Sequence, residues 1–71
     1  MSDIEVQVKQ VGEDRSGTYR LEAGSKISDL LEELGQNPEA VVTRRDGKIV
    51  PEADELEDGD QIEVIPVVSG G

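Results

Sequence analysis

The N-terminal segment alternates apolar and polar residues with a period of two. Ile4, Val6 and Val8 are separated by polar side chains. This alternation predicts a strand with one buried face and one solvent-exposed face. The polar residues 12–17, which begin and end with glycine, predict a hairpin connection. Residues 18–21 then predict a short second strand that pairs antiparallel with the first.

The apolar period changes from two to 3.6 after residues 23–25. Apolar side chains recur at helical spacing and charged side chains fill the opposite side, which predicts one amphipathic helix. We expect Ser25 to be its N-cap and Gly35 to end it at the C′ position. The apolar stripe is expected to cover one face of a sheet, and it consists of Ile27, Leu30, Leu31 and Leu34.

A second hairpin is predicted after the helix. Residues 41–45 and 48–50 have the composition of strands, and Pro51 is expected to end the second of them. The Asp46-Gly47 pair between them is typical of a type I′ turn, which needs positive φ at both central residues. These residues therefore predict a third and a fourth strand joined by a tight turn.

The last strand has two different apolar phases. Ile62 and Val64 share one phase, whereas Ile65 and Val67 share the other. If the helix covers only one face of the sheet, Ile65 and Val67 lie on the open face. Exposed apolar side chains in one place favour a docking surface, and coverage by loops is the alternative.

The resulting element order is ββαβββ, with the last strand expected to run parallel beside the first. This order predicts an α+β fold of the β-grasp, or ubiquitin-like, type. Its mixed sheet would have about five strands, with one main helix on one face. We expect residues 1–68 to form this single domain and residues 69–71 to form a flexible C-terminal tail that ends in Gly-Gly.

Composition narrows the range of functions. The 71 residues include no cysteine and no histidine, so neither a thiolate nucleophile nor a zinc cluster is available, and we expect no metal site and no enzyme activity. The 17 acidic residues outnumber the 7 basic ones, which gives a net charge of -10. Phosphate backbones would be repelled, so nucleic acid is not an expected partner. No apolar run is long enough to cross a bilayer, and we expect a soluble, cytoplasmic monomer.

The C-terminal residues are the best candidates for chemistry. Gly70 and Gly71 lack side chains, so this terminus can enter a narrow slot that any Cβ would block. Residues 69–71 can carry the terminal carboxylate roughly 10 Å beyond the last strand. A frayed terminus without function is the alternative.

Several segments together resemble the ThiS/MoaD family of sulfur carriers and the related small archaeal modifier proteins. The resemblance lies in residues 26–34, the Asp46-Gly47 turn, residues 56–62 and the closing residues 65–71. Gly70 and Gly71 match the family motif directly, and Val68 and Ser69 match it loosely. Val67 stands where molybdopterin-type tails often have a doubled proline, which is a departure from that branch.

The resemblance implies a carrier that another protein activates. An adenylating enzyme of the ubiquitin-activating type would use ATP and magnesium to convert the Gly71 carboxylate into an acyl-adenylate, and the chain itself would need no cofactor. Sulfur transfer would then give a thiocarboxylate for molybdenum cofactor, thiamine or tRNA thiolation. Attack by a target-protein lysine would instead give an isopeptide bond. A passive β-grasp interaction module, without an activated C-terminus, is the alternative.

We expect the activating enzyme, and a target protein or sulfur-accepting enzyme, to contact residues near the tail. The candidates are Ile65, Val67, Val68, Ser69 and the two arginines Arg44 and Arg45. The arginines belong to a small basic cluster around the second hairpin. Local ion pairs with the many carboxylates are an equally good explanation for that cluster.

Overall fold

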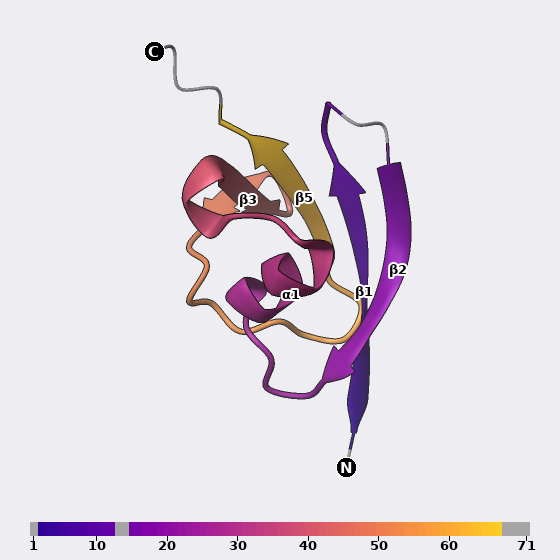
Figure 1. Ribbon diagram of the computed structural model, residues 1–71. Helices are drawn as coiled ribbons and strands as arrows, with labels where there is room; N and C mark the ends of the chain where they lie inside the picture. Colours follow the sequence, from indigo (N-terminus) through magenta and orange to yellow (C-terminus); the bar gives the residue numbers. More distant parts are fainter. Residues whose placement is uncertain (1, 13–14, 68–71) are drawn as a thin grey trace.

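The fold follows the predicted element order (Figure 1). The computed structural model describes residues 2–12 and 15–67. Seven elements occur in this part of the chain: β1 (Asp3–Gln10), β2 (Arg15–Glu22), α1 (Ile27–Leu34), the 3-10 helix η1 (Pro38–Ala40), β3 (Val41–Arg45), β4 (Lys48–Val50) and β5 (Gln61–Pro66). The predicted order ββαβββ is confirmed, with η1 as an addition between α1 and β3.

The strands form one mixed sheet in the order β2-β1-β5-β3-β4. The two central strands, β1 and β5, pair parallel from Gln7 with Gln61 to Gln10 with Val64, as predicted. The other neighbouring pairs are antiparallel. The last strand therefore lies in the middle of the sheet, and the chain leaves it beside the end of β1.

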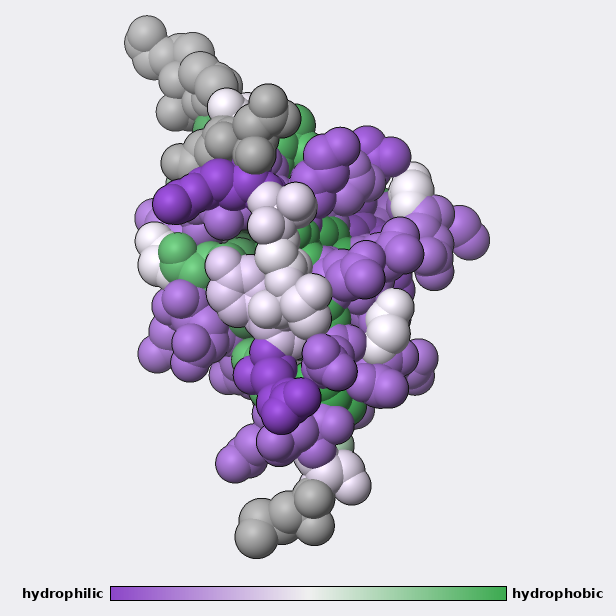
Figure 2. Space-filling model, turned by 90° about the vertical axis from the view of Figure 1, so that its right-hand side faces the viewer, coloured by the Kyte–Doolittle hydropathy of each residue, from purple (hydrophilic) through white to green (hydrophobic). Residues whose placement is uncertain are grey.

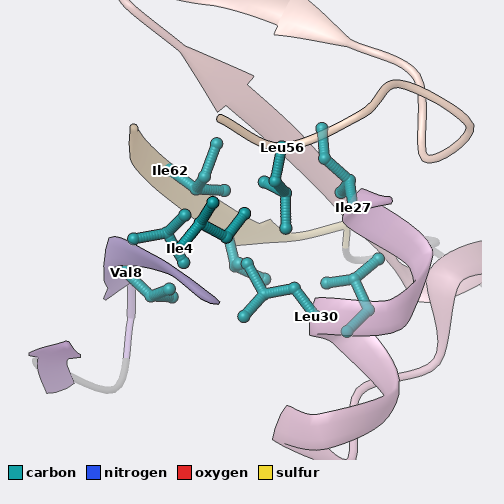
Figure 3. Packing of buried hydrophobic residues seen from close by; sticks show 9 residues of the cluster. Ile4, Val8, Ile27, Leu30, Leu56 and Ile62 are labelled. Atoms are coloured by element: carbon teal, nitrogen blue, oxygen red, sulfur yellow. The ribbon is translucent and has the colours of Figure 1, made fainter. Parts of the chain in front are cut away.

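The core lies between α1 and one face of the sheet. Buried side chains from β1, α1 and β5 point toward one another there, together with Leu56 from the loop before β5 (Figure 3). Val6, Ile27 and Leu30 are fully inaccessible to solvent. The predicted alternation of β1 and the predicted apolar stripe of α1 are thus the two halves of one core, apart from Leu34, which is only partly buried.

The second strand is longer than the sequence predicted. It runs over Arg15–Glu22 rather than residues 18–21, and it pairs with β1 from Asp3 with Glu22 to Gln10 with Arg15. Gly17, expected in the connection, is paired with Val8. The long hairpin ladder overrides the low strand propensity of residues 15–17, because strand propensity is weak compared with tertiary context.

The start of the helix also differs from the prediction. Lys26, not Ser25, is the N-cap, and its N–H donates to the Asp29 carboxylate at 2.8 Å. The following two N–H groups donate to the carbonyl oxygens of Asp54 and Glu52, each at 2.9 Å. Backbone groups of a distant loop therefore satisfy the helix start, so that a serine side chain is not needed.

Two predicted turn features are confirmed. Gly35 adopts φ 71° at the end of α1, the left-handed conformation that ends many helices. Asp46 and Gly47 have φ 53° and 79°, the two positive values that a type I′ turn requires. Within residues 2–12 and 15–67 no helix is long and apolar enough to cross a membrane.

Candidate docking face beside the C-terminal segment

The helix covers only one face of the sheet, and the register shows which residues occupy the other. Val42 of β3 pairs with Ile65 of β5, opposite in phase to the buried Val64. The Val11 N–H donates to the Val64 carbonyl at 2.9 Å, which extends the parallel ladder by one residue and places Val11 beside Ile65. Three apolar residues from three adjacent segments thus form a row across the uncovered face.

Two further apolar side chains flank this row. The Val67 N–H donates to the Ala40 carbonyl at 2.9 Å, which continues the β3–β5 ladder and keeps Val67 in phase with Ile65. Ile49 pairs with Arg44, on the same face. Val67 is 50% exposed and Ile49 is 72% exposed. We call the set Val11, Val42, Ile49, Ile65 and Val67 the open-face patch.

The half of this face farther from the C-terminal segment is polar. Lys9 pairs with Glu63, which in turn pairs with Arg44, so that charges of alternating sign cross the sheet. The Arg44 Nε lies 3.7 Å from the Glu63 carboxylate. A shallow depression lies farther along, and its lining includes the polar side chains of Gln7, Thr18 and Gln61. The face is therefore divided into an apolar end beside the last strand residue and a charged end, which also carries Ile49 at the sheet edge.

The structure separates the two predicted arginines. Arg44 lies on the open face, one pair away from the Val42–Ile65 row. Arg45 has the opposite phase, and its Nε lies 3.2 Å from the Asp60 carboxylate while its Nη2 donates to the Glu55 carbonyl. Arg45 thus ties the loop before β5 to β3 and does not lie with Ile65. The alternation of side chains along a strand already places two consecutive residues such as Arg44 and Arg45 on opposite faces.

Sequence reasoning missed three members of the open-face patch, namely Val11, Val42 and Ile49. Val11 continues the exposed phase of β1, so the alternation of that strand could have located it. Its neighbours are set by parallel pairing with β5, which is distant in sequence. Ile49 lies in the middle of β4, which has only three residues, and a strand of this length is too short to show an alternation of apolar and polar positions.

The C-terminal segment starts at the apolar end of this face. Pro66 ends β5, and a Cβ on Gly12 would lie 3.6 Å from the Pro66 side chain, so the turn after β1 adjoins the same place. The predicted site residues Val68, Ser69, Gly70 and Gly71 lie outside the described residues. Among the described residues, no group of three or more acidic side chains could hold a metal ion.

Comparison with known sequences gives a family match over most of the chain. The model of the ThiS family matches residues 8–71. An uncharacterized protein of Archaeoglobus fulgidus is 37% identical over 68 residues, which cover 96% of this chain and all of that protein. The sulfur carrier protein TtuB of Thermus thermophilus is 42% identical over 45 residues, covering 63% of this chain and 69% of TtuB.

Comparison with solved structures confirms the fold. A putative molybdopterin converting factor subunit 1 from Pyrococcus furiosus superposes with a TM-score of 0.76 at 24% identity, covering 92% of this chain and 99% of the other. Ubiquitin from Caldiarchaeum subterraneum superposes with a TM-score of 0.73 at 12% identity, covering 99% of this chain and 100% of the other. The fold is therefore the ubiquitin-like β-grasp that the element order predicted.

Proposed function

This chain belongs to the ThiS family, and we propose that it carries sulfur as a thiocarboxylate on Gly71. Proteins of this kind are small carriers or modifiers rather than enzymes, and they act with an activating enzyme and an acceptor. The observation that carries the proposal is the extent of the family match, which continues through the last residue, Gly71. The similarity to a protein named as a sulfur carrier supports sulfur as the cargo.

The chemistry follows from the weakness of a carboxylate as an electrophile. A partner enzyme joins the Gly71 carboxylate to the α-phosphate of ATP, with magnesium, and pyrophosphate leaves. A persulfide sulfur on a partner then attacks the acyl carbon and AMP leaves with the C–O bond electrons. A partner thiol finally cleaves the S–S bond, which leaves the thiocarboxylate on this chain and a disulfide on the partner. The diglycine gives the C-terminus access to the narrow slot where these steps occur.

The open-face patch supports the docking step of this proposal. Four of its five apolar side chains, all except Ile49, gather around the end of β5, where the C-terminal segment begins. An activating enzyme that covered this patch would bury apolar surface and hold the start of that segment at the same time. Arg44 lies next to the patch and could add a rim contact, whereas Arg45 is engaged with Asp60. In this proposal the carrier acts as a monomer in the cytoplasm.

The test is the intact mass of the chain after incubation with its activating enzyme, ATP, magnesium and a sulfur donor. Replacement of one oxygen by one sulfur is the expected result. A variant without Gly70 and Gly71 should give no product although its thermal unfolding is unchanged. Full cellular activity of that variant would instead support a passive interaction module.

The same reaction distinguishes the carrier from a protein modifier. A lysine amine that attacked the acyl-adenylate would expel AMP and leave an isopeptide bond. Incubation in a cell extract, followed by a denaturing gel, would then show ladders that depend on ATP and on Gly71. Such ladders without any thiocarboxylate would overturn sulfur transport as the function.

A further inference from the structure

The strand β2 forms an edge of the sheet and has backbone groups free to bind another strand. It pairs only with β1 in the described sheet. The Ala23 N–H donates to the Ser2 carbonyl, so the hydrogen-bonded pairs of this ladder contain the odd-numbered residues of β2. The backbone N–H and C=O groups of the odd-numbered residues therefore point toward β1. The N–H and C=O groups of Ser16, Thr18 and Arg20 therefore point outward.

The opposite edge of the sheet is protected, whereas β2 is not. The strand β4 has only three residues, begins with Lys48 and is followed by Pro51, three features that discourage strand addition. The strand β2 has eight residues, contains no proline and keeps an unbroken register with β1. An edge of this length is suited to bind an extended segment through backbone hydrogen bonds.

A groove between β2 and α1 lies beside this edge. Leu21 of β2 is half-buried and provides an apolar contact, while most of the surrounding side chains are acidic. Figure 2, which views the molecule from the β2 side, shows a weakly polar strip along the middle of this side, with hydrophobic patches at its margins and hydrophilic surface beyond them. The groove is lined by Arg20, Leu21, Glu22, Ser25, Asp29, Glu32 and Glu33.

We propose that β2 binds an extended, lysine- or arginine-containing segment of a partner protein as an additional strand. Backbone groups of the segment pair with Ser16, Thr18 and Arg20, which supplies sequence-independent hydrogen bonds. Side chains on the helix-facing side of the added strand lie over Leu21 and reach the carboxylates of Glu32 and Glu33. The four carboxylates against one arginine in the groove select a basic segment by charge complementarity.

Charge also argues against a second copy of this chain as the occupant. Each copy carries a net charge of -10, so two copies repel each other in dilute buffer. Pairing of two β2 strands would also bring the two acidic grooves together. The bound segment is therefore basic and belongs to another protein. This contact lies at the sheet edge, separate from the open-face patch, and does not depend on chemistry at Gly71.

The first experiment uses the full chain and a synthetic eight-residue peptide of alternating lysine and valine, blocked at both ends. NMR titration is expected to shift the amide signals of Ser16, Thr18 and Arg20. The same peptide with glutamate in place of lysine is expected to bind at least tenfold more weakly. Equal binding of both peptides, or shifts confined to Val42 and Ile65, would overturn the proposal.

Matched variants then test the two parts of the contact. Glu32→Gln with Glu33→Gln should weaken the peptide by about three- to tenfold, as expected for two exposed charge contacts. Glu39→Gln with Glu52→Gln, which removes two exposed carboxylates outside the groove, should leave binding unchanged. Equal losses of affinity in the two double variants would show that binding depends only on the overall negative charge, which would overturn the groove as the binding site.

Thr18→Pro removes one outward N–H and should weaken the peptide by tenfold or more, whereas Thr18→Ala should not. Thermal unfolding of both variants shows whether the fold is kept. If Thr18→Pro unfolds, a peptide methylated on alternate backbone nitrogens blocks the same bonds from the other side and should not bind. Undiminished binding of that peptide would contradict strand addition, and a dimer of the free chain by light scattering would contradict a segment of another protein as the occupant. Thiocarboxylate formation by Thr18→Pro reports separately on the proposed carrier function.

Discussion

The two faces of the sheet use apolar residues in different ways. On the covered face, buried residues such as Val6, Val8 and Ile62 run along the strands and meet α1. On the open face, most of the apolar residues lie at the end near Pro66, whereas Ile49 lies in the same row as Arg44 and the remainder carries charges and amides. The same strands thus supply a continuous core on one side and a localised patch on the other.

The apolar positions of the covered face are needed for folding, whereas those of the open face are available for binding. A domain of 71 residues has little core to spare, so each covered-face residue contributes much of the net stability. The open-face patch adds less to folding than the core, because Ile49 and Val67 stay exposed and Val42 and Ile65 are only partly buried. Its concentration beside the C-terminal segment is then better explained by a partner.

The sharpest test makes the same substitution on both faces. Ile62→Thr replaces a side chain that is 1% exposed, and it should reduce the free energy of unfolding by about 2–4 kcal/mol through lost burial and a buried hydroxyl. Ile49→Thr replaces one that is 72% exposed and should change it by less than about 0.5 kcal/mol. Chemical denaturation measures both, and Ile62→Val, with a loss of about 1 kcal/mol, provides a milder variant. Equal losses at the two positions would contradict the division between the faces.

The next test asks whether the open-face patch serves the activating enzyme. Ile65→Ser combined with Val67→Ser should lower kcat/KM for adenylation at least tenfold, which corresponds to about 1.4 kcal/mol of lost binding in the transition state. Gln61→Ser is a control in the same strand, at an exposed position of the polar half. Unchanged kcat/KM in the double variant would leave the patch without its proposed role. Denaturation midpoints of both variants exclude unfolding as the cause.

The comparison of the faces also shows how far the sequence could predict the structure. Local periodicity was sufficient for β1, α1 and the Asp46-Gly47 turn, because these depend on residues close together in the chain. The predicted length of β2 and the predicted start of α1 were wrong, because both features depend on residues that are distant in the sequence. The N–H of Ile27 donates to the carbonyl of Asp54. A backbone acceptor of this kind leaves no side-chain pattern in the sequence from which it could be predicted.

The candidate site was predicted to a similar degree. The opposite phases of Val64 and Ile65 placed Ile65 on the open face, as the structure shows. Val11, which lies beside Ile65 on that face, was missed because its position depends on the parallel pairing of β1 with β5, two strands that are distant in the sequence. The structure does not describe Gly70 and Gly71, so their role stays a prediction from the family motif and the chemistry of the carboxylate.

The two neighbouring arginines allow a smaller test across the same two faces. Arg45→Ala removes contacts to the Asp60 carboxylate and the Glu55 carbonyl, and it should reduce the free energy of unfolding by about 1–2 kcal/mol. Arg44→Ala removes only a half-exposed ion pair with Glu63 and should cost less than about 0.5 kcal/mol. Denaturation at constant salt measures both. A larger loss for Arg44→Ala would reverse the assignment of Arg45 as the structural arginine.

The smallest effect concerns the acidic surface, which surrounds both faces. A net charge of -10 adds self-repulsion to the folded state, and salt screens it over about 10 Å at 0.1 M. The melting temperature should therefore rise by several degrees between dilute buffer and molar sodium chloride, since about 1 kcal/mol corresponds to 4–8 °C in a domain of this size. A neutral osmolyte at equal osmolality is the control for effects unrelated to charge. A melting temperature that stayed flat or fell with salt would show that local ion pairs such as Arg45–Asp60 outweigh the general repulsion.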